Sequence, residues 1–301
     1  MIINSNSLDL VCQGFRTVFN NAFSAATPQY EKIAMVVSSA TREETYGWLG
    51  EFPSLREWIA ERVYKNLKAH AFTIKNRDFE ATVQVRRNDI EDDRYGVYAP
   101  LFSEMGRSTA SHPDELIFGL LASGFSETCY DGQYFFDADH LMVVDDQEVS
   151  ISNLQLPDEE KEEEEGPAWF LLDTSREVKP LIFQKRRAYQ FVVRDNISVD
   201  DVFEKKLLTY SVDARLNVGF GLWQLAFGSK APLTKANYEA ARSSMMGLKG
   251  DYGRPLGITP TVLVVPPSLE GTARRLLKAT VNGGEANEWA GSAELIVSHH
   301  L

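Results

Sequence analysis

The side chains best suited to chemistry lie in one short stretch that is rich in turn residues. Asp137, Asp139 and His140 fall within four consecutive positions. Carboxylates and imidazoles bind hard and borderline metal ions, so a metal-dependent hydrolase is one hypothesis for this stretch. A metal site needs further ligands and the sequence identifies none. We therefore favour the interpretation that these side chains cap turns and form hydrogen bonds.

Cys129 and His140 offer a second combination, a thiol nucleophile and a base. A reactive thiol needs surroundings that stabilise the thiolate, and none are visible around Cys129, so we interpret it as a buried structural cysteine. The sequence also lacks the Gly-Lys-Ser/Thr of a phosphate-binding loop and the Gly-x-Ser-x-Gly of a nucleophile elbow. We predict that the protein is not an enzyme and has no catalytic residue, cofactor or metal ligand.

Composition excludes several classes of protein. The chain has 301 residues and a net charge of −12, which argues against a dedicated binder of nucleic acid or of anionic membranes. Two cysteines cannot form a disulfide framework, which fits a reducing compartment. The N-terminal residues do not read as a secretory signal, and the longest apolar runs are too short to cross a bilayer.

The elements that must position these side chains are predicted from hydrophobic periodicity. In residues 92–126 the apolar side chains recur at spacings of three and four, which places them on one stripe of a helix. Pro100 and Pro113 interrupt the pattern, so the stretch is either one long kinked helix or two helices nearly end to end. It is either an ordinary pair of core helices or a spine to which separate lobes attach.

Two aromatic stretches precede this helix. Residues 6–26 predict an amphipathic helix whose apolar face includes Phe15 and Phe19, and this face contacts either the chain's own core or a neighbouring subunit. The excursion at 46–85 is rich in aromatics but broken by glycine and proline until a strand at 79–85. We expect another subunit to bury its aromatic side chains, because large apolar patches seldom stay exposed to water. The interface candidates of both stretches are Phe15, Phe19, Trp48, Phe52, Trp58 and Tyr64.

The second half of the chain predicts a compact α/β lobe. Residues 141–166 contain an acidic run, which is typical of a solvated loop. Thr234 is a predicted helix cap, and the apolar run 259–265 is typical of a buried central strand. A helix is expected at 269–279. Further strands are predicted at 169–172, 181–183, 188–193, 207–212 and 293–297.

Taken together, motifs spread over nearly the whole chain resemble those of the major head (capsid) proteins of Mu-like phages and prophages. Each motif alone is weak, and their combination is specific. They are Gly47-Trp-Leu-Gly50, Leu55-Arg-Glu-Trp58, Phe79-Glu-Ala-Thr82, Asn88-Asp-Ile-Glu-Asp-Asp93, His112-Pro-Asp-Glu-Leu116, Asp131-Gly-Gln133, Phe135-Phe-Asp137, Asp139-His140, Trp169-Phe-Leu-Leu-Asp173, Lys179-Pro-Leu181, Gly221-Leu-Trp-Gln-Leu225 and Val264-Val-Pro-Pro-Ser-Leu269.

The resemblance implies the α+β, Hong Kong 97-type phage capsid fold. Such a fold has an N-terminal arm, an extended E-loop, a peripheral domain with a long spine helix, and an axial α/β domain. The corresponding segments are an arm at 1–45, an E-loop at 46–85, a peripheral domain at 86–140, an acidic insertion or loop at 141–166, a strand-rich peripheral or axial segment at 167–215, an axial domain at 216–292 and a return strand at 293–301.

The family also implies a function and partners. The protein is expected to self-assemble, as hexamers and pentamers, into an icosahedral shell that encloses double-stranded DNA without sequence-specific binding. Scaffolding, portal and decoration proteins are the other expected partners, with no membrane. The expected location is the virion, after assembly in the bacterial cytoplasm. The competing hypotheses are the hydrolase that uses Asp137, Asp139 and His140, and another structural protein of the virion.

Overall fold

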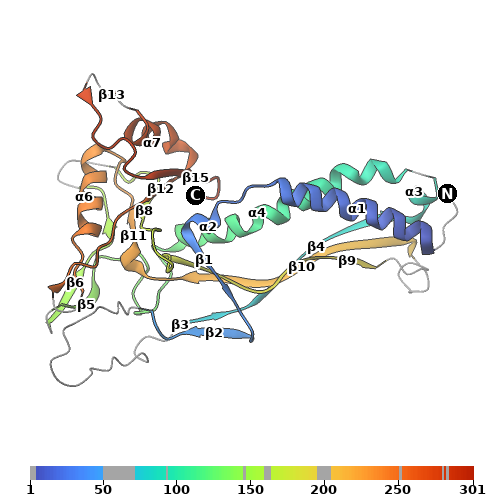
Figure 1. Cartoon of the computed structure of the whole chain (residues 1–301), viewed down its shortest axis with the longest axis horizontal. Helices are drawn as coiled ribbons and strands as arrows, with labels where there is room; N and C mark the ends of the chain where they lie inside the picture. The colour runs from blue at the N-terminus through green and yellow to red at the C-terminus, as the bar shows by residue number, and fades with distance from the viewer. Residues whose placement is uncertain are drawn as a thin grey trace.

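The fold consists of an elongated body that joins a more compact lobe (Figure 1). The body comprises the helices α1 and α4 and the long strands β4, β9 and β10. The lobe comprises the sheet β15-β12-β8-β11-β7 with the helices α6 and α7. The computed structural model describes residues 5–49, 72–92, 94–144, 147–158, 164–194, 205–250, 253–279, 281–282 and 285–301.

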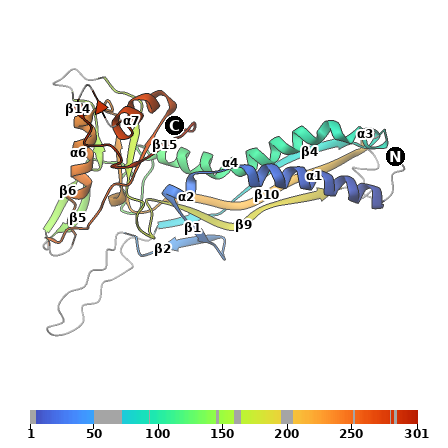
Figure 2. The ribbon, with the colours of Figure 1, turned by 45° about the horizontal axis from the view of Figure 1, so that its top comes forward.

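The two long helices of the body lie side by side over the same sheet (Figures 1 and 2). They are α1, Ser5–Ala25, and α4, Ala99–Ser123. Gly106 of α4 permits their close approach, because a Cβ atom there would lie 2.4 Å from the carbonyl oxygen of Phe19. The amphipathic helix predicted at 6–26 is confirmed within a residue at each end.

The predicted spine is one continuous helix with Pro113 inside it. The expectation that it begins near residue 92 was wrong, because Tyr95–Tyr98 form a short 3-10 helix and α4 begins at Ala99. Pro100 explains this start, since proline lacks the backbone N–H of an inner helical residue and is tolerated in the first turn. At 1.5 Å per residue, α4 is about 37 Å long.

The sheet of the body has the strand order β1-β9-β10-β4. β1 is parallel to β9, and the other two pairs are antiparallel. The sequence predicted short strands here, whereas β9 and β10 have 14 residues each. The strands continue through polar residues, whose side chains lie on the exposed face of the sheet and so interrupt the apolar pattern. Their bounds are β1 Ala34–Ser38, β4 Arg77–Arg86, β9 Leu181–Arg194 and β10 Leu207–Phe220.

The helices cover one face of this sheet. Phe15 of α1 stacks on Phe102 of α4 with 4.2 Å between ring centroids, and both rings meet Tyr210 of β10 edge-on. In β10, buried residues such as Tyr210 alternate with partly exposed ones such as Ser211, as a sheet with one covered face requires. The opposite face carries polar side chains, among them Thr82 and Ser211 with 3.0 Å between their hydroxyl oxygens.

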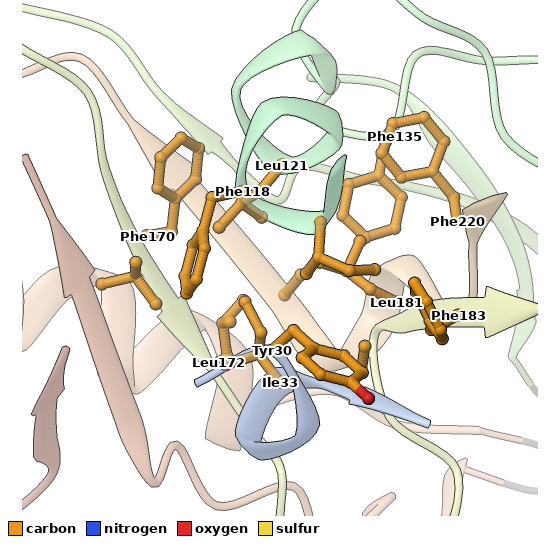
Figure 3. Packing of buried hydrophobic residues seen from close by; sticks show 14 of the residues in the cluster. Tyr30, Ile33, Phe118, Leu121, Phe135, Phe170, Leu172, Leu181, Phe183 and Phe220 are labelled. Carbon is orange, nitrogen blue, oxygen red and sulfur yellow. The ribbon is translucent and has the colours of Figure 1, made fainter. Parts of the chain in front are cut away.

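A second core joins the body to the lobe (Figure 3). It gathers the C-terminal half of α4, the short helix α2 (Tyr30–Ile33), the start of β9 and the lobe strand β8. Phe118 and Leu121 supply the α4 side, and Phe170 and Leu172 supply the lobe side. The two regions therefore share buried apolar surface.

The central strands of the lobe sheet are buried on both faces. In β8, Trp169–Leu172, Phe170 and Leu172 belong to the shared core, while Trp169 and Leu171 belong to the core beneath α6 and α7. All four residues are fully buried, which explains the unbroken apolar run in the sequence. The other strands of this sheet are β7 Leu154–Gln155, β11 Ala226–Ser229, β12 Val262–Val265 and β15 Glu294–Val297.

The predicted helices of the lobe are present. α6, Lys235–Met246, begins after Thr234, whose hydroxyl accepts a hydrogen bond from the backbone N–H of Asn237, so the predicted cap is confirmed. α7 spans Glu270–Leu277. Among the described residues no helix is both long and apolar enough to cross a membrane.

Short two-stranded units complete the fold. The segment 141–166, expected as an acidic insertion or loop, contains the strands β6 and β7 and most of β5, which the sequence did not predict. The described residues of its acidic run, 157–158 and 164–166, lie outside helices and strands, and residues 145–146 and 159–163 lie outside the described residues. β5 and β6 pair in an antiparallel ladder whose register sets Met142 opposite Val149. The remaining elements are β2 Glu43–Tyr46, β3 Phe72–Lys75, α3 Arg87–Glu91, β5 His140–Val144, β6 Gln147–Ile151, β13 Val281–Asn282 and β14 Glu285–Ala286, with 3-10 helices at Trp223–Leu225 and Pro267–Leu269.

Candidate functional site

The turn that follows α4 brings Cys129, Asp131 and His140 together. Asp131 lies between the other two: its Oδ2 is 2.8 Å from His140 Nδ1, and its Oδ1 accepts a hydrogen bond from the Cys129 thiol at 3.1 Å. Their candidate ligand atoms all lie within 4.8 Å of one another. Gly132 allows the tight turn because its φ of +88° favours glycine. We call these three residues the turn cluster.

Cys129 and His140 are buried and Asp131 is partly buried, and Trp223 packs against the histidine ring. His140 is fully buried, and its ring stacks on Trp223 with 4.0 Å between centroids and 9° between planes. The backbone N–H of Gln133 also donates to Asp131 Oδ1. Because an ionised carboxylate only accepts hydrogen bonds, His140 Nδ1 carries the proton that points at Asp131.

The electrostatics of the cluster do not activate the thiol. Burial raises the pKa of Cys129 and the charge of Asp131 raises it further. Burial also pushes the pKa of Asp131 upward, but hydrogen bonds from His140 and Cys129 outweigh it, so that pKa is lowered. At neutral pH the thiol is therefore protonated beside an ionised carboxylate, which agrees with the interpretation of Cys129 as a structural cysteine rather than a nucleophile.

The three residues proposed from sequence for a metal site do not form one. Asp137 accepts hydrogen bonds from the backbone N–H groups of Tyr134 and Ala138, and Asp139 accepts one from the side chain of Gln133. Both aspartates support turns, as the favoured interpretation held. Only His140 belongs to the turn cluster. Sequence reasoning missed Asp131, whose signal was the Asp-Gly turn two residues after Cys129.

The predicted interface aromatics fall into three groups. Phe15 and Phe19 are 3% and 4% exposed within the body, which favours the chain's own core over a neighbouring subunit as the partner of this helix. Trp48 is partly buried beside Tyr46, with 6.2 Å between ring centroids. Phe52, Trp58 and Tyr64 lie outside the described residues.

The two described ends of the excursion that carries these aromatics are the paired strands β2 and β3, which we call its root. Hydrogen bonds hold this root on the sheet of the body. β2 and β3 pair with each other, and Tyr46 donates a hydrogen bond from its hydroxyl to Gln184 of β9 at 2.8 Å. The Gln184 amide donates in turn to the carbonyl of Ile74 and to Asn76 Oδ1, each at 3.0 Å. A buried polar network with all these partners satisfied fixes one arrangement of the strands.

Two further features hold this root against the sheet. Ile74 lies directly over Gly219 of β10, where an added Cβ atom would come within 2.3 Å of the isoleucine side chain. The Glu44 carboxylate closes the preceding loop by accepting hydrogen bonds from the backbone N–H groups of Ala40 and Thr41 and from the Ser39 hydroxyl. These hydrogen bonds, of which the one from the Ala40 N–H contributes most, lower the pKa of Glu44 to about 2.

Sequence reasoning also missed several exposed apolar side chains and an open sheet edge. Val97 is 72% exposed and Leu10 67% exposed in the body, and Leu141 is 61% exposed in β5. β1 pairs only with the first five residues of β9, and no other described strand pairs along that edge of residues 186–194. Unpaired edges and apolar side chains are surfaces that other chains can cover.

Comparisons with known sequences cover the whole chain. The family model described as Mu-like prophage major head subunit gpT matches residues 8–301. The major capsid protein of Escherichia phage Mu is 42% identical over 307 residues, which covers 100% of both proteins. The Mu-like prophage FluMu major head subunit of Haemophilus influenzae is 43% identical over 268 residues, or 88% of this chain and 86% of that protein.

Solved structures agree with these similarities. The chain matches a subunit in the procapsid of bacteriophage JBD30 with a TM-score of 0.86 and 40% identity, over 99% of this chain and 100% of that one. It matches a subunit in the JBD30 capsid with a TM-score of 0.78 and 32% identity, over 100% and 99% of the two chains. A JBD30 capsid decorated with minor capsid protein trimers gives 0.75 and 32%, over 94% of each chain.

Proposed function

Because the chain belongs to the family of Mu-like prophage major head subunits, we propose that its aromatic excursion between β2 and β3 joins each subunit of a phage head to the next. The chain is a major capsid protein with the Hong Kong 97-type α+β fold, and it self-assembles into the head shell. A subunit of this kind works by association, so its functional residues are those that contact other copies.

The observation that carries the proposal is the root of the excursion. Tyr46, Gln184 and Asn76 form a buried network, and Ile74 packs over Gly219, so the two described ends of the excursion are held at a fixed place on the sheet. Phe52, Trp58 and Tyr64 belong to the segment between these fixed ends. Aromatic side chains of this number need a partner to exclude water, and in a shell that partner is a neighbouring copy.

The domain assignment follows the same logic, with the predicted bounds moved to the ends of the strands of the body. We assign the body, including β4 and β10, to the peripheral domain, 46–76 to the E-loop, 221–292 to the axial domain and 293–301 to the return strand. The body includes α1, because Phe15 and Phe19 are buried against it, so the N-terminal arm is reduced to the segments that flank this helix.

The remaining partners are proposed from the family. We propose that the shell encloses double-stranded DNA without sequence-specific contacts. A subunit with a net charge of −12 is expected to bind DNA phosphates only weakly. Scaffolding and portal proteins complete the head during assembly in the host cytoplasm. Decoration by minor capsid protein trimers, named for the JBD30 capsid, is proposed for this chain as well. The family is structural, and we propose no catalytic role.

A deletion tests the proposed joining role. Residues 50–71 are replaced by a short Gly-Ser linker, which keeps β2 and β3 paired at the root. The expected product is a folded, soluble subunit that forms no particles in light scattering and electron microscopy, because the shell contacts are lost. A matched variant with the same linker in place of the acidic residues 159–163 is expected to assemble as the unmodified chain does.

Particles of normal size from the 50–71 variant would refute the assignment. If that variant does not fold, the double substitution Phe52→Ala and Trp58→Ala provides the second test. It keeps the chain length and is expected to reduce particle yield while the circular dichroism spectrum of the subunit is unchanged.

A further inference from the structure

We propose that Cys129, Asp131 and His140 form a binding site for a divalent transition-metal ion, and that zinc is the ion their donor atoms suit best. The turn cluster offers one thiolate, one imidazole and one carboxylate. This mixture of soft and borderline donors is typical of zinc sites, whereas magnesium and calcium take oxygen ligands. Among the described residues it is the one group of three such side chains close enough to share an ion.

The distances within the cluster are close to those that zinc requires. With bonds of about 2.3 Å to sulfur and about 2.0 Å to nitrogen and oxygen, tetrahedral zinc separates its ligand atoms by roughly 3.3–3.6 Å. His140 Nδ1 lies 2.8 Å from Asp131 Oδ2, and Cys129 Sγ lies 3.1 Å from Oδ1 of the same carboxylate. One ligand atom from each of the three residues lies within 4.8 Å of the other two, so the side chains need to shift only by on the order of 1 Å to place all three donors around one ion.

The surroundings hold the ligands in place before the ion arrives. The His140 ring is fixed by its stacking on Trp223, and the Asp131 carboxylate is oriented by the backbone N–H of Gln133. Supporting contacts of this kind reduce the ordering that binding would otherwise require. In the described structure His140 Nε2 is buried without a hydrogen-bond partner, so no contact at that nitrogen opposes a change of tautomer.

Charge and protons also balance. Zinc displaces the thiol proton of Cys129 to solvent, and the imidazole proton moves from Nδ1 to Nε2, which leaves Nδ1 free to bind the ion. A thiolate and a carboxylate then neutralise the two positive charges, as a buried ion requires. Because one proton is released, affinity for the ion is expected to rise with pH.

The site would tie two parts of the subunit together. Cys129 and Asp131 belong to the turn after α4, whereas Trp223, which holds His140, lies in the 3-10 helix before β11. An ion bound only by the folded chain stabilises it by mass action. Bound zinc is therefore expected to raise the melting temperature of the subunit.

The test uses Co²⁺ as a spectroscopic probe for the full-length protein, purified without a polyhistidine tag. Titration is expected to give one equivalent of bound cobalt per chain and a near-ultraviolet thiolate-to-cobalt charge-transfer band that Zn²⁺ abolishes. Cys129→Ser is expected to lose the band. Cys12→Ser is the matched control, because Cys12 is the other cysteine of the chain and lies in α1, and it is expected to keep the band.

The proposal is overturned if the unmodified chain gives no such band, or if the band survives in Cys129→Ser. A second measurement is independent of variant folding. Zinc is expected to slow alkylation of Cys129 in the unmodified protein at least tenfold, as followed by mass spectrometry, without slowing that of Cys12. Equal alkylation rates of Cys129 with and without zinc would also reject the site.

Discussion

The lobe and the body of this subunit differ in how completely each buries its own sheet. In the lobe, every residue of β8, β11 and β12 is buried, because apolar clusters cover both faces. In the body, α1 and α4 cover one face only, and the outer part of β9, residues 189–194, alternates between partly buried and exposed residues.

This difference links the lobe to the stability of the single subunit and the body to contacts between subunits. A sheet that is buried on both faces is complete within one chain and supports the fold by itself. A sheet with one polar, solvated face and an open edge leaves backbone groups that another chain can bind. We infer that the lobe carries most of the resistance to unfolding, and that the body offers more of the surface on which other copies act.

Hydrogen exchange is expected to show the largest difference between the lobe and the body. In the unassembled subunit, amides of β12 are expected to exchange on the order of 10³-fold or more slowly than those on the open edge of residues 186–194, because the former exchange only through global opening. In assembled particles the open edge is expected to become protected. Equal protection of both segments in the free subunit would remove the contrast between the regions.

Gly219→Ala tests how tightly Ile74 of β3 packs on β10 of the body. The new Cβ atom would lie 2.3 Å from Ile74 Cδ1, so the variant is expected to lose about 1–3 kcal/mol in the free energy of unfolding, measured by chemical denaturation. Ile74→Ala in the same chain is expected to relieve the clash, which gives a non-additive double-mutant cycle.

Gly119→Ala is the matched control for this substitution. Gly119 lies in α4 and has nothing within 4 Å of an added Cβ atom, so alanine there is expected to stabilise the subunit by up to about 1 kcal/mol through helix propensity. If Gly219→Ala is as stable as Gly119→Ala, the close packing of Ile74 on Gly219 does not fix the position of β3 on β10.

The smallest expected effect concerns an ion pair that links the two regions. Lys32 of α2 lies 2.6 Å from Glu294 of β15, and the side chains are 45% and 55% exposed. A cycle of Lys32→Ala and Glu294→Ala is expected to give a coupling of about 0–1 kcal/mol that falls as salt is added. A larger coupling that salt leaves unchanged would mean that this contact, in addition to the shared core, holds the lobe on the body.

Local sequence was enough to predict much of the lobe and the course of the long helices. The apolar run of β12 indicated a buried central strand, the short apolar run of β8 indicated a strand, and Thr234 marked the start of α6. Sequence placed α4 correctly in its middle but not at its start, where Pro100 limited the helix to residues from Ala99 onward.

Motifs distributed along the sequence were enough to recognise the family, and with it the head-subunit function. The spacing of apolar residues was enough to predict many of the helices and strands, because both kinds of signal depend on residue type and position. Only the tertiary structure decided which surfaces those elements cover. It buried Phe15 and Phe19 within the body, joined Tyr46 to Gln184 across 138 positions, and placed Asp131 between Cys129 and His140. Such contacts depend on how distant segments pack, and no local pattern encodes that geometry.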